Sequence, residues 1–192
     1  MKKEHTAGVH AHVEMFLAAN REFVEQRHYV EYPASKFPAQ KTLILSCMDA
    51  RLSALLLPAL GLKNGEVNVI KSAGAVITDP YGSLMRSVLV AIYEFDVEHI
   101  FVIGHDDCGM AHLDGYQMVE KMQQRGISKA VIDAVHHHVD LENWLQKIGH
   151  SEASIGRTVK LIRDHPLLPR NVKTHGLCLS PETGALRVVE NA

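Results

Sequence analysis

Short apolar runs alternate with polar and turn-forming residues between residues 41 and 103. Residues 41–46 (KTLILS), 67–71 (VNVIK) and 99–103 (HIFVI) are short and rich in Val, Ile and Leu, so they predict buried strands. Between them, residues 53–60 and a stretch ending near residue 95 place apolar residues at helical spacing. The alternation of strand and helix predicts an α/β fold, a parallel-sheet core with flanking helices.

Turn-forming residues mark where these elements begin and end. Gly61 ends the helix predicted before it, and Asn64-Gly65 predicts the turn that leads into the second strand. Asp79-Pro80 predicts the start of the next helix, with Asp79 as its N-cap and Pro80 at its first position.

The two ends of the chain show different patterns. Residues 10–30 have an amphipathic helical repeat that Pro33 and Pro38 interrupt, so residues 1–34 are interpreted as an N-terminal helical arm. Residues 35–192 are interpreted as a single α/β domain. Its C-terminal part is predicted to contain helices over 116–147 and 154–164, a strand over 172–179, and an edge hairpin completed by residues 186–189.

Composition narrows the possible functions. The chain has 192 residues, a net charge of −2 and 46% hydrophobic residues, so a basic nucleic-acid-binding face is not expected. No window is as apolar as a membrane span requires and no targeting segment is visible, so a cytoplasmic protein that binds neither nucleic acid nor membrane is predicted. Three cysteines do not describe a disulfide scaffold, which leaves them free for metal binding.

Chemically unusual residues follow the predicted strands directly. Cys47 follows the first strand, and His105 and Cys108 follow the third. Since the carboxyl ends of parallel strands share one edge of the sheet, these side chains are expected to converge there. Two thiolates and an imidazole suit zinc, with Asp49 as the candidate for the fourth position and Arg51 as its two-pronged partner. The alternatives are that the cysteines are simply buried apolar residues and that Asp49 and Arg51 form an ordinary ion pair.

Other residues near these strand ends have more than one interpretation. Ala73, Gly74 and Gly109 have small side chains that would let backbone approach a small substrate, although simple turn residues explain them equally well. Asp106 and Asp107 are expected either to support the metal ligands or to cap a helix that begins near Cys108. Elsewhere, Cys178 is predicted to be core, and the three consecutive histidines at 136–138 are predicted to lie on a solvated or partly buried helix face.

Four sequence motifs together resemble the β-class carbonic anhydrases. They are CMDAR at 47–51, KSAGAVITD at 71–79, GHDDCGM at 104–110 and the C-terminal stretch HPLLPRNVKTHGLCLSPETGALRVV at 165–189. The resemblance implies zinc (Zn²⁺) bound by the residues matching Cys47, His105 and Cys108, a dyad matching Asp49 and Arg51, and reversible hydration of carbon dioxide to bicarbonate and a proton. It also implies a homodimer or homotetramer in which the N-terminal arm embraces a partner subunit.

The chain also departs from the family pattern. Lys71-Ser72 stands where members commonly have Arg-Asn, and Pro38 stands where many have a glutamine that contacts substrate. Two alternatives to carbon dioxide hydration also stay open. One is a hydrolase that acts on carbon disulfide or carbonyl sulfide at the same site. The other is a structural zinc or regulatory protein in which Asp49 is a permanent fourth ligand.

Overall fold

The computed structural model describes residues 2–146 and 151–191, with side-chain surroundings given for 11–146 and 152–191. The chain divides into two compact units, Met1–Lys36 and Phe37–Ala192. The first contains helix α1 (Lys2–Glu25) and the short 3-10 helix η1 (His28–Glu31). Helix α1 begins earlier than the amphipathic repeat from residue 10 indicated. Among the described residues, no helix is both long and apolar enough to cross a lipid bilayer.

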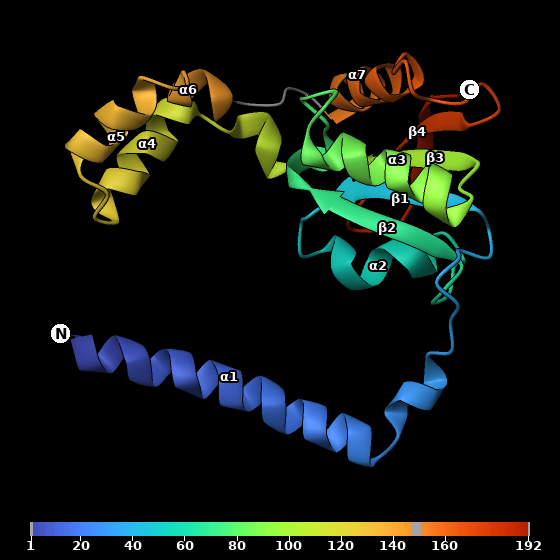
Figure 1. Ribbon diagram of the computed structural model, residues 1–192, viewed down its shortest axis with the longest axis horizontal. Coiled ribbons are helices and arrows are strands. Elements are labelled where there is room, and N and C mark those ends of the chain that lie inside the picture. The colour runs from blue at the N-terminus through green and yellow to red at the C-terminus, as the bar shows by residue number, and fades with distance from the viewer. Residues whose placement is uncertain (1, 147–150, 192) are drawn as a thin grey trace. The chain divides into compact units, whose positions relative to one another are not determined.

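The second unit contains a five-stranded sheet with the order β2-β1-β3-β4-β5 (Figure 1). The strands are β1 (Thr42–Cys47), β2 (Val67–Ser72), β3 (His99–His105), β4 (Lys173–Leu179) and β5 (Leu186–Glu190). The first four run parallel, and β5 pairs antiparallel with β4. The predicted parallel-sheet core and its C-terminal edge hairpin are therefore confirmed.

Helices cover both faces of this sheet (Figure 1). Leu52 and Leu56 of α2 (Leu52–Ala59) pack on one face, against residues such as Ile44 and Ile103. Helices α3 (Ser83–Phe95) and α7 (Ser151–Arg163) pack on the opposite face. Since β1 and β3 are covered on both sides, their sequences are continuous apolar runs rather than alternating ones.

The predicted start of α3 is wrong. The helix begins at Ser83, with Gly82 as its N-cap. The Asp79 carboxylate instead accepts a hydrogen bond of 2.8 Å from the backbone N–H of Tyr81, and the Asp79 carbonyl accepts one from Gly82. Asp79 therefore forms a turn before the helix, because a short carboxylate can bond to nearby backbone N–H groups outside a helix as well as at its first turn.

The region predicted to be helical after residue 115 contains three helices. They are α4 (Gly115–Gln124), α5 (Lys129–His136) and α6 (Leu141–Trp144). Residue 147, the last of the predicted stretch, lies outside the described residues. His136, His137 and His138 are exposed at the end of α5, where His136 pairs with Glu142, as expected of a solvated face.

Two further 3-10 helices follow the carboxyl ends of β2 and β3. They are η2 (Ala73–Ala75) and η3 (Gly109–His112). Both lie at the sheet edge where β1 also ends, because β1 pairs in parallel register with β2 on one side and β3 on the other. The fold therefore gathers three chain segments at one place, and each contains residues that the sequence singled out.

Candidate metal centre

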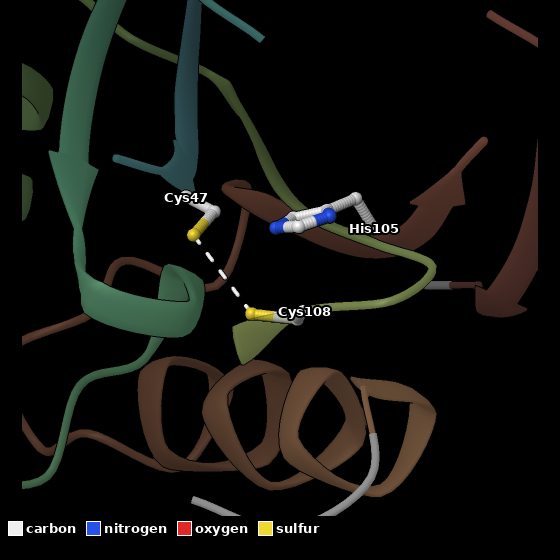
Figure 2. A group of neighbouring side chains, drawn as sticks. All are labelled: Cys47, His105 and Cys108. Atoms are coloured by element: carbon white, nitrogen blue, oxygen red, sulfur yellow. Dashed lines mark hydrogen bonds between the residues drawn. The ribbon is translucent and has the colours of Figure 1, made fainter. Parts of the chain in front are cut away.

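Three buried side chains converge at the carboxyl ends of β1 and β3 (Figure 2). Cys47 is the last residue of β1, His105 is the last residue of β3, and Cys108 comes three residues later, immediately before η3. The two cysteine sulfurs lie 4.0 Å apart. One ligand atom from each of the three residues lies within 4.8 Å of the other two.

The geometry and chemistry of this group fit a zinc ion. Zinc–sulfur bonds of about 2.3 Å at a tetrahedral angle put two sulfurs about 3.8 Å apart, close to the observed 4.0 Å. Two thiols and one imidazole are ligands that zinc prefers over the harder cations. All three side chains are buried, so an ion held there would be shielded from bulk water. The three predicted ligands are therefore brought together in the arrangement that the metal needs.

A backbone hydrogen bond fixes the orientation of the imidazole. His105 Nδ1 lies 2.8 Å from the carbonyl oxygen of Asp106. Because a carbonyl can only accept, Nδ1 is the donor, which leaves Nε2 as the nitrogen with a lone pair in the neutral ring. Nε2, the ring nitrogen that would bind a metal, lies 3.8 Å from the Asp49 carboxylate.

The surroundings of Cys47 favour its thiolate form. Burial raises the pKa of this thiol. Hydrogen bonds with His105 and with the backbone N–H groups of Asp49 and Gly74 lower it by more, so that the pKa falls to about 7, below its usual value. For Cys108, burial is the main effect, and it raises the pKa of the thiol. The pKa of His105 is raised, mainly by its hydrogen bond with Cys47. One sulfur thus becomes anionic near neutral pH, which is the form that binds metal.

Asp49 lies beside the three ligands and is held by Arg51. Arg51 Nε lies 3.0 Å from Asp49 Oδ1, and Arg51 Nη2 lies 2.9 Å from Asp49 Oδ2. The Arg51 backbone N–H donates to the same carboxylate at 2.9 Å. These bonds lower the pKa of Asp49 to about 2. The carboxylate is therefore ionised at neutral pH and drawn to the guanidinium.

Arg51 also reaches the loop between His105 and Cys108. Its Nη1 donates to Asp107 Oδ2 at 3.1 Å, and its Nη2 donates to the Asp107 carbonyl at 3.0 Å. Asp107 has a positive φ of 51°, a conformation that few residues other than glycine adopt. One guanidinium thus ties the segment after β1 to the loop after β3. The sequence offered no signal for this contact, because residues 51 and 107 are far apart along the chain.

The predicted capping role of the two aspartates is wrong. The 3-10 helix that follows Cys108 has no side-chain hydrogen bond at its N-cap. Asp107 bonds to Arg51 instead, and Asp106 bonds to Arg187 of β5. Both aspartates therefore support the loop that bears His105 and Cys108, which was the other interpretation of these residues.

The three small residues proposed to contact substrate lie in the two 3-10 helices. Ala73 and Gly74 are in η2, where Gly74 has a positive φ of 73° that a side chain would strain. Gly109 begins η3, and a Cβ added to it would meet no other atom within 4 Å. Backbone geometry thus accounts for Gly74, whereas open space lies beside Gly109. Contact of all three with substrate stays a prediction.

Cys178 is the remaining cysteine, and it is not part of the metal group. It is fully buried in β4, as predicted for a core residue. Burial raises the pKa of its thiol to about 11. Its sulfur lies 3.8 Å from Asp106 Oδ1. Cys178 therefore stays a neutral thiol and provides a buried control for the two proposed ligands.

Comparisons with known proteins agree with this geometry. The carbonic anhydrase family profile matches residues 42–186, which include every residue of the metal group. "Putative carbonic anhydrase YtiB" of Bacillus subtilis (strain 168) is 47% identical over 176 residues, covering 91% of this chain and 94% of that protein. A "Carbon disulfide hydrolase" of Acidithiobacillus thiooxidans is 30% identical over 156 residues, covering 75% and 74%.

A solved structure extends the agreement to three dimensions. The β-carbonic anhydrase isoform I (TvaCA1) of Trichomonas vaginalis superposes with a TM-score of 0.85 at 33% identity, covering 93% of this chain and 97% of that one. Sequence profile, sequence relatives and fold thus agree with the motifs at residues 47–51 and 104–110. The chain belongs to the carbonic anhydrase family, in its β class.

Proposed function

We propose that this chain is a zinc enzyme that catalyses the reversible hydration of carbon dioxide: CO₂ + H₂O gives HCO₃⁻ and H⁺. The observation that supports this most is the separation of two sets of side chains at one site. Cys47, His105 and Cys108 form a three-ligand group, while Asp49 beside them is bonded to Arg51. A catalytic zinc site keeps one position open, and with these three ligands the fourth position would be left for water.

Each residue of the site has a distinct task in this proposal. The two thiolates and His105 Nε2 would hold the zinc, with the imidazole oriented by its Nδ1 bond to the Asp106 carbonyl. When bound, zinc supplies a Lewis acid that lowers the pKa of a water to about 7 and so provides a nucleophile for carbon dioxide. The ionised Asp49 would accept a hydrogen bond from the water and orient it. By binding both carboxylate oxygens, Arg51 would keep Asp49 from becoming a fourth ligand of the zinc.

The protein is also proposed to be a homodimer or homotetramer, as the family resemblance implied. Light scattering coupled to gel filtration measures this directly. A monomer at micromolar concentration would contradict the assembly without affecting the proposed reaction.

A stopped-flow assay of carbon dioxide hydration, combined with metal analysis, tests the proposed reaction. The zinc-loaded protein should hydrate carbon dioxide, lose activity when zinc is removed, and regain it when zinc is restored. The same samples should be offered carbon disulfide and carbonyl sulfide, since one relative is named a carbon disulfide hydrolase. Sulfide release without hydration would favour a hydrolase. One zinc per chain without turnover of any substrate would favour a structural or regulatory zinc protein.

A further inference from the structure

Residues 105–108 form a tight loop that places two of the three proposed ligands. His105 and Cys108 lie at its ends, and Asp106 and Asp107 lie between them. Arg51 holds Asp107 from one side, through both its carboxylate and its carbonyl. Asp106 is held instead by residues of β4 and β5.

Asp106 is fixed at three points. Its backbone N–H donates to the Leu179 carbonyl at the end of β4, at 3.0 Å. Its carboxylate receives two parallel hydrogen bonds from Arg187, of 2.9 Å from Nη1 to Oδ2 and 2.7 Å from Nη2 to Oδ1. The residue whose carbonyl orients His105 is thus fastened through both its backbone and its side chain.

Arg187 is itself held in place for this contact. It lies on β5, in register with Cys178 of β4, which is in turn in register with Gly104 near the end of β3. Its Nε donates to the Glu152 carboxylate of α7 at 2.9 Å, so each of the three guanidinium nitrogens donates a hydrogen bond. Because a planar fork that binds a carboxylate at two points sets the angle as well as the distance, the contact restricts rotation of Asp106.

We propose that Arg187 is a positioning residue for the metal site: by clamping the Asp106 carboxylate, it holds the carbonyl that accepts the Nδ1–H of His105 and so aims Nε2 at the metal. This inference rests on the proposed zinc function. The chain of contacts is Arg187 to Asp106 through 2.7 and 2.9 Å bonds, then Asp106 to His105 through a 2.8 Å bond. Partners that orient a metal-bound imidazole commonly affect metal affinity strongly.

A role in general stability needs its own control. The side chains of Arg187 and Asp106 are 46% and 45% exposed, so solvent weakens the attraction between their charges, but a two-pronged pair can still stabilise a fold. The chain offers a matched comparison in Arg163 of α7, which pairs with Glu190 of β5 at 3.2 Å with exposures of 43% and 38%. Arg163 contacts the same strand and loses the same charge on mutation, but that pair does not involve Asp106.

Zinc affinity, measured in competition with a chromophoric chelator at fixed pH, tests this role in four proteins. They are the wild type, Arg187→Gln, Arg187→Lys and the control Arg163→Gln. Arg187→Gln should weaken zinc binding about 10- to 100-fold, while Arg163→Gln should bind as tightly as the wild type. Arg187→Lys keeps the charge without the two-pronged geometry, so its affinity should also fall. The visible d–d bands of the cobalt-substituted protein should shift in Arg187→Gln and not in the control.

Equal zinc affinities and cobalt spectra in Arg187→Gln and Arg163→Gln would overturn the inference. If Arg187→Gln does not fold, Asp106→Asn replaces it, because this variant keeps the side-chain size but removes the charged acceptor. The same loss of affinity is then expected, and an unchanged affinity is again contradictory. A wild-type protein that binds no zinc would contradict the proposed function as well. Tight binding by the wild type and by every variant would contradict only the role of Arg187.

Discussion

Arg51 binds Asp49 through two parallel hydrogen bonds, 3.0 Å from Nε to Oδ1 and 2.9 Å from Nη2 to Oδ2. Arg51 thereby keeps the Asp49 carboxylate ionised beside the proposed ligands, and both carboxylate oxygens accept hydrogen bonds from the guanidinium. Asp49 is expected to act in catalysis rather than in metal retention. The two properties can be measured separately in the same variant.

Asp49→Asn should reduce the rate of carbon dioxide hydration by about 100-fold or more, because a neutral amide accepts a hydrogen bond more weakly than an ionised carboxylate and orients the water less well. Zinc content should stay at one per chain, since the three ligands are intact. Stopped-flow rates and metal analysis of the same preparation provide the check. Loss of zinc together with activity would mean that Asp49 is a required ligand.

Cys108→Ala should abolish stoichiometric zinc binding, because only two ligands of the group would remain. Cys178→Ala is the matched control: it removes a cysteine that is also buried but lies outside the group. Metal analysis after dialysis should find one zinc per chain in the control and far less in Cys108→Ala. Equal zinc content in the two variants would show that Cys108 is not a ligand.

The positions of β1 and β3 could be predicted because they depend on local pattern: a buried parallel strand is a continuous apolar run. The strands extend to Cys47 and His105, one and two residues beyond the predicted ends, so both side chains lie at the strand ends as expected. The start of α3 could not be placed, since Asp79 can bond to backbone N–H groups in a turn as readily as at a helix end.

The contacts of the two aspartates depend on tertiary structure. Arg187 lies on the last strand, and only the β3-β4-β5 order brings it to Asp106. Likewise, Arg51 reaches Asp107 only because β1 and β3 are neighbours. Local propensity says nothing about such pairs, so the sequence could place both aspartates near the ligands but could not choose between capping and support.

The Arg51–Asp49 pair should make stability depend on pH in a specific range. Arg51 lowers the pKa of Asp49 to about 2, below the value of about 4 expected in an unfolded chain. The pair therefore stabilises the fold fully above about pH 4, and this contribution is lost as the pH falls through about 2. Urea unfolding of the zinc-free wild type and Arg51→Gln, from pH 6 to 3, measures it. The difference in unfolding free energy should be constant above pH 5 and narrow toward pH 3. A difference that widens on acidification contradicts the assignment.

Gly104 should be intolerant of a side chain, because α7 packs directly onto it beside His105. A Cβ added there would lie 2.7 Å from Ile155 Cδ1 and 2.9 Å from its Cγ1. Gly104→Ala should lower the free energy of unfolding by about 1–3 kcal/mol. The control is Gly156→Ala, at the residue that follows Ile155 in α7. Its Cβ would meet nothing within 4 Å, and alanine favours a helix. Urea unfolding should show destabilisation in the first variant alone. The effect of Gly104→Ala should be smaller in an Ile155→Ala background than in the wild type, because the atoms that the new Cβ would meet are absent there.

Zinc K-edge X-ray absorption on the zinc-loaded protein tests the metal centre most directly. Two sulfur neighbours at about 2.3 Å and two nitrogen or oxygen neighbours at about 2.0–2.1 Å are expected for Cys47, Cys108, His105 and one further light atom. A shell without sulfur, or one with more than two sulfurs, would contradict the proposed ligand set and the open fourth position that it leaves.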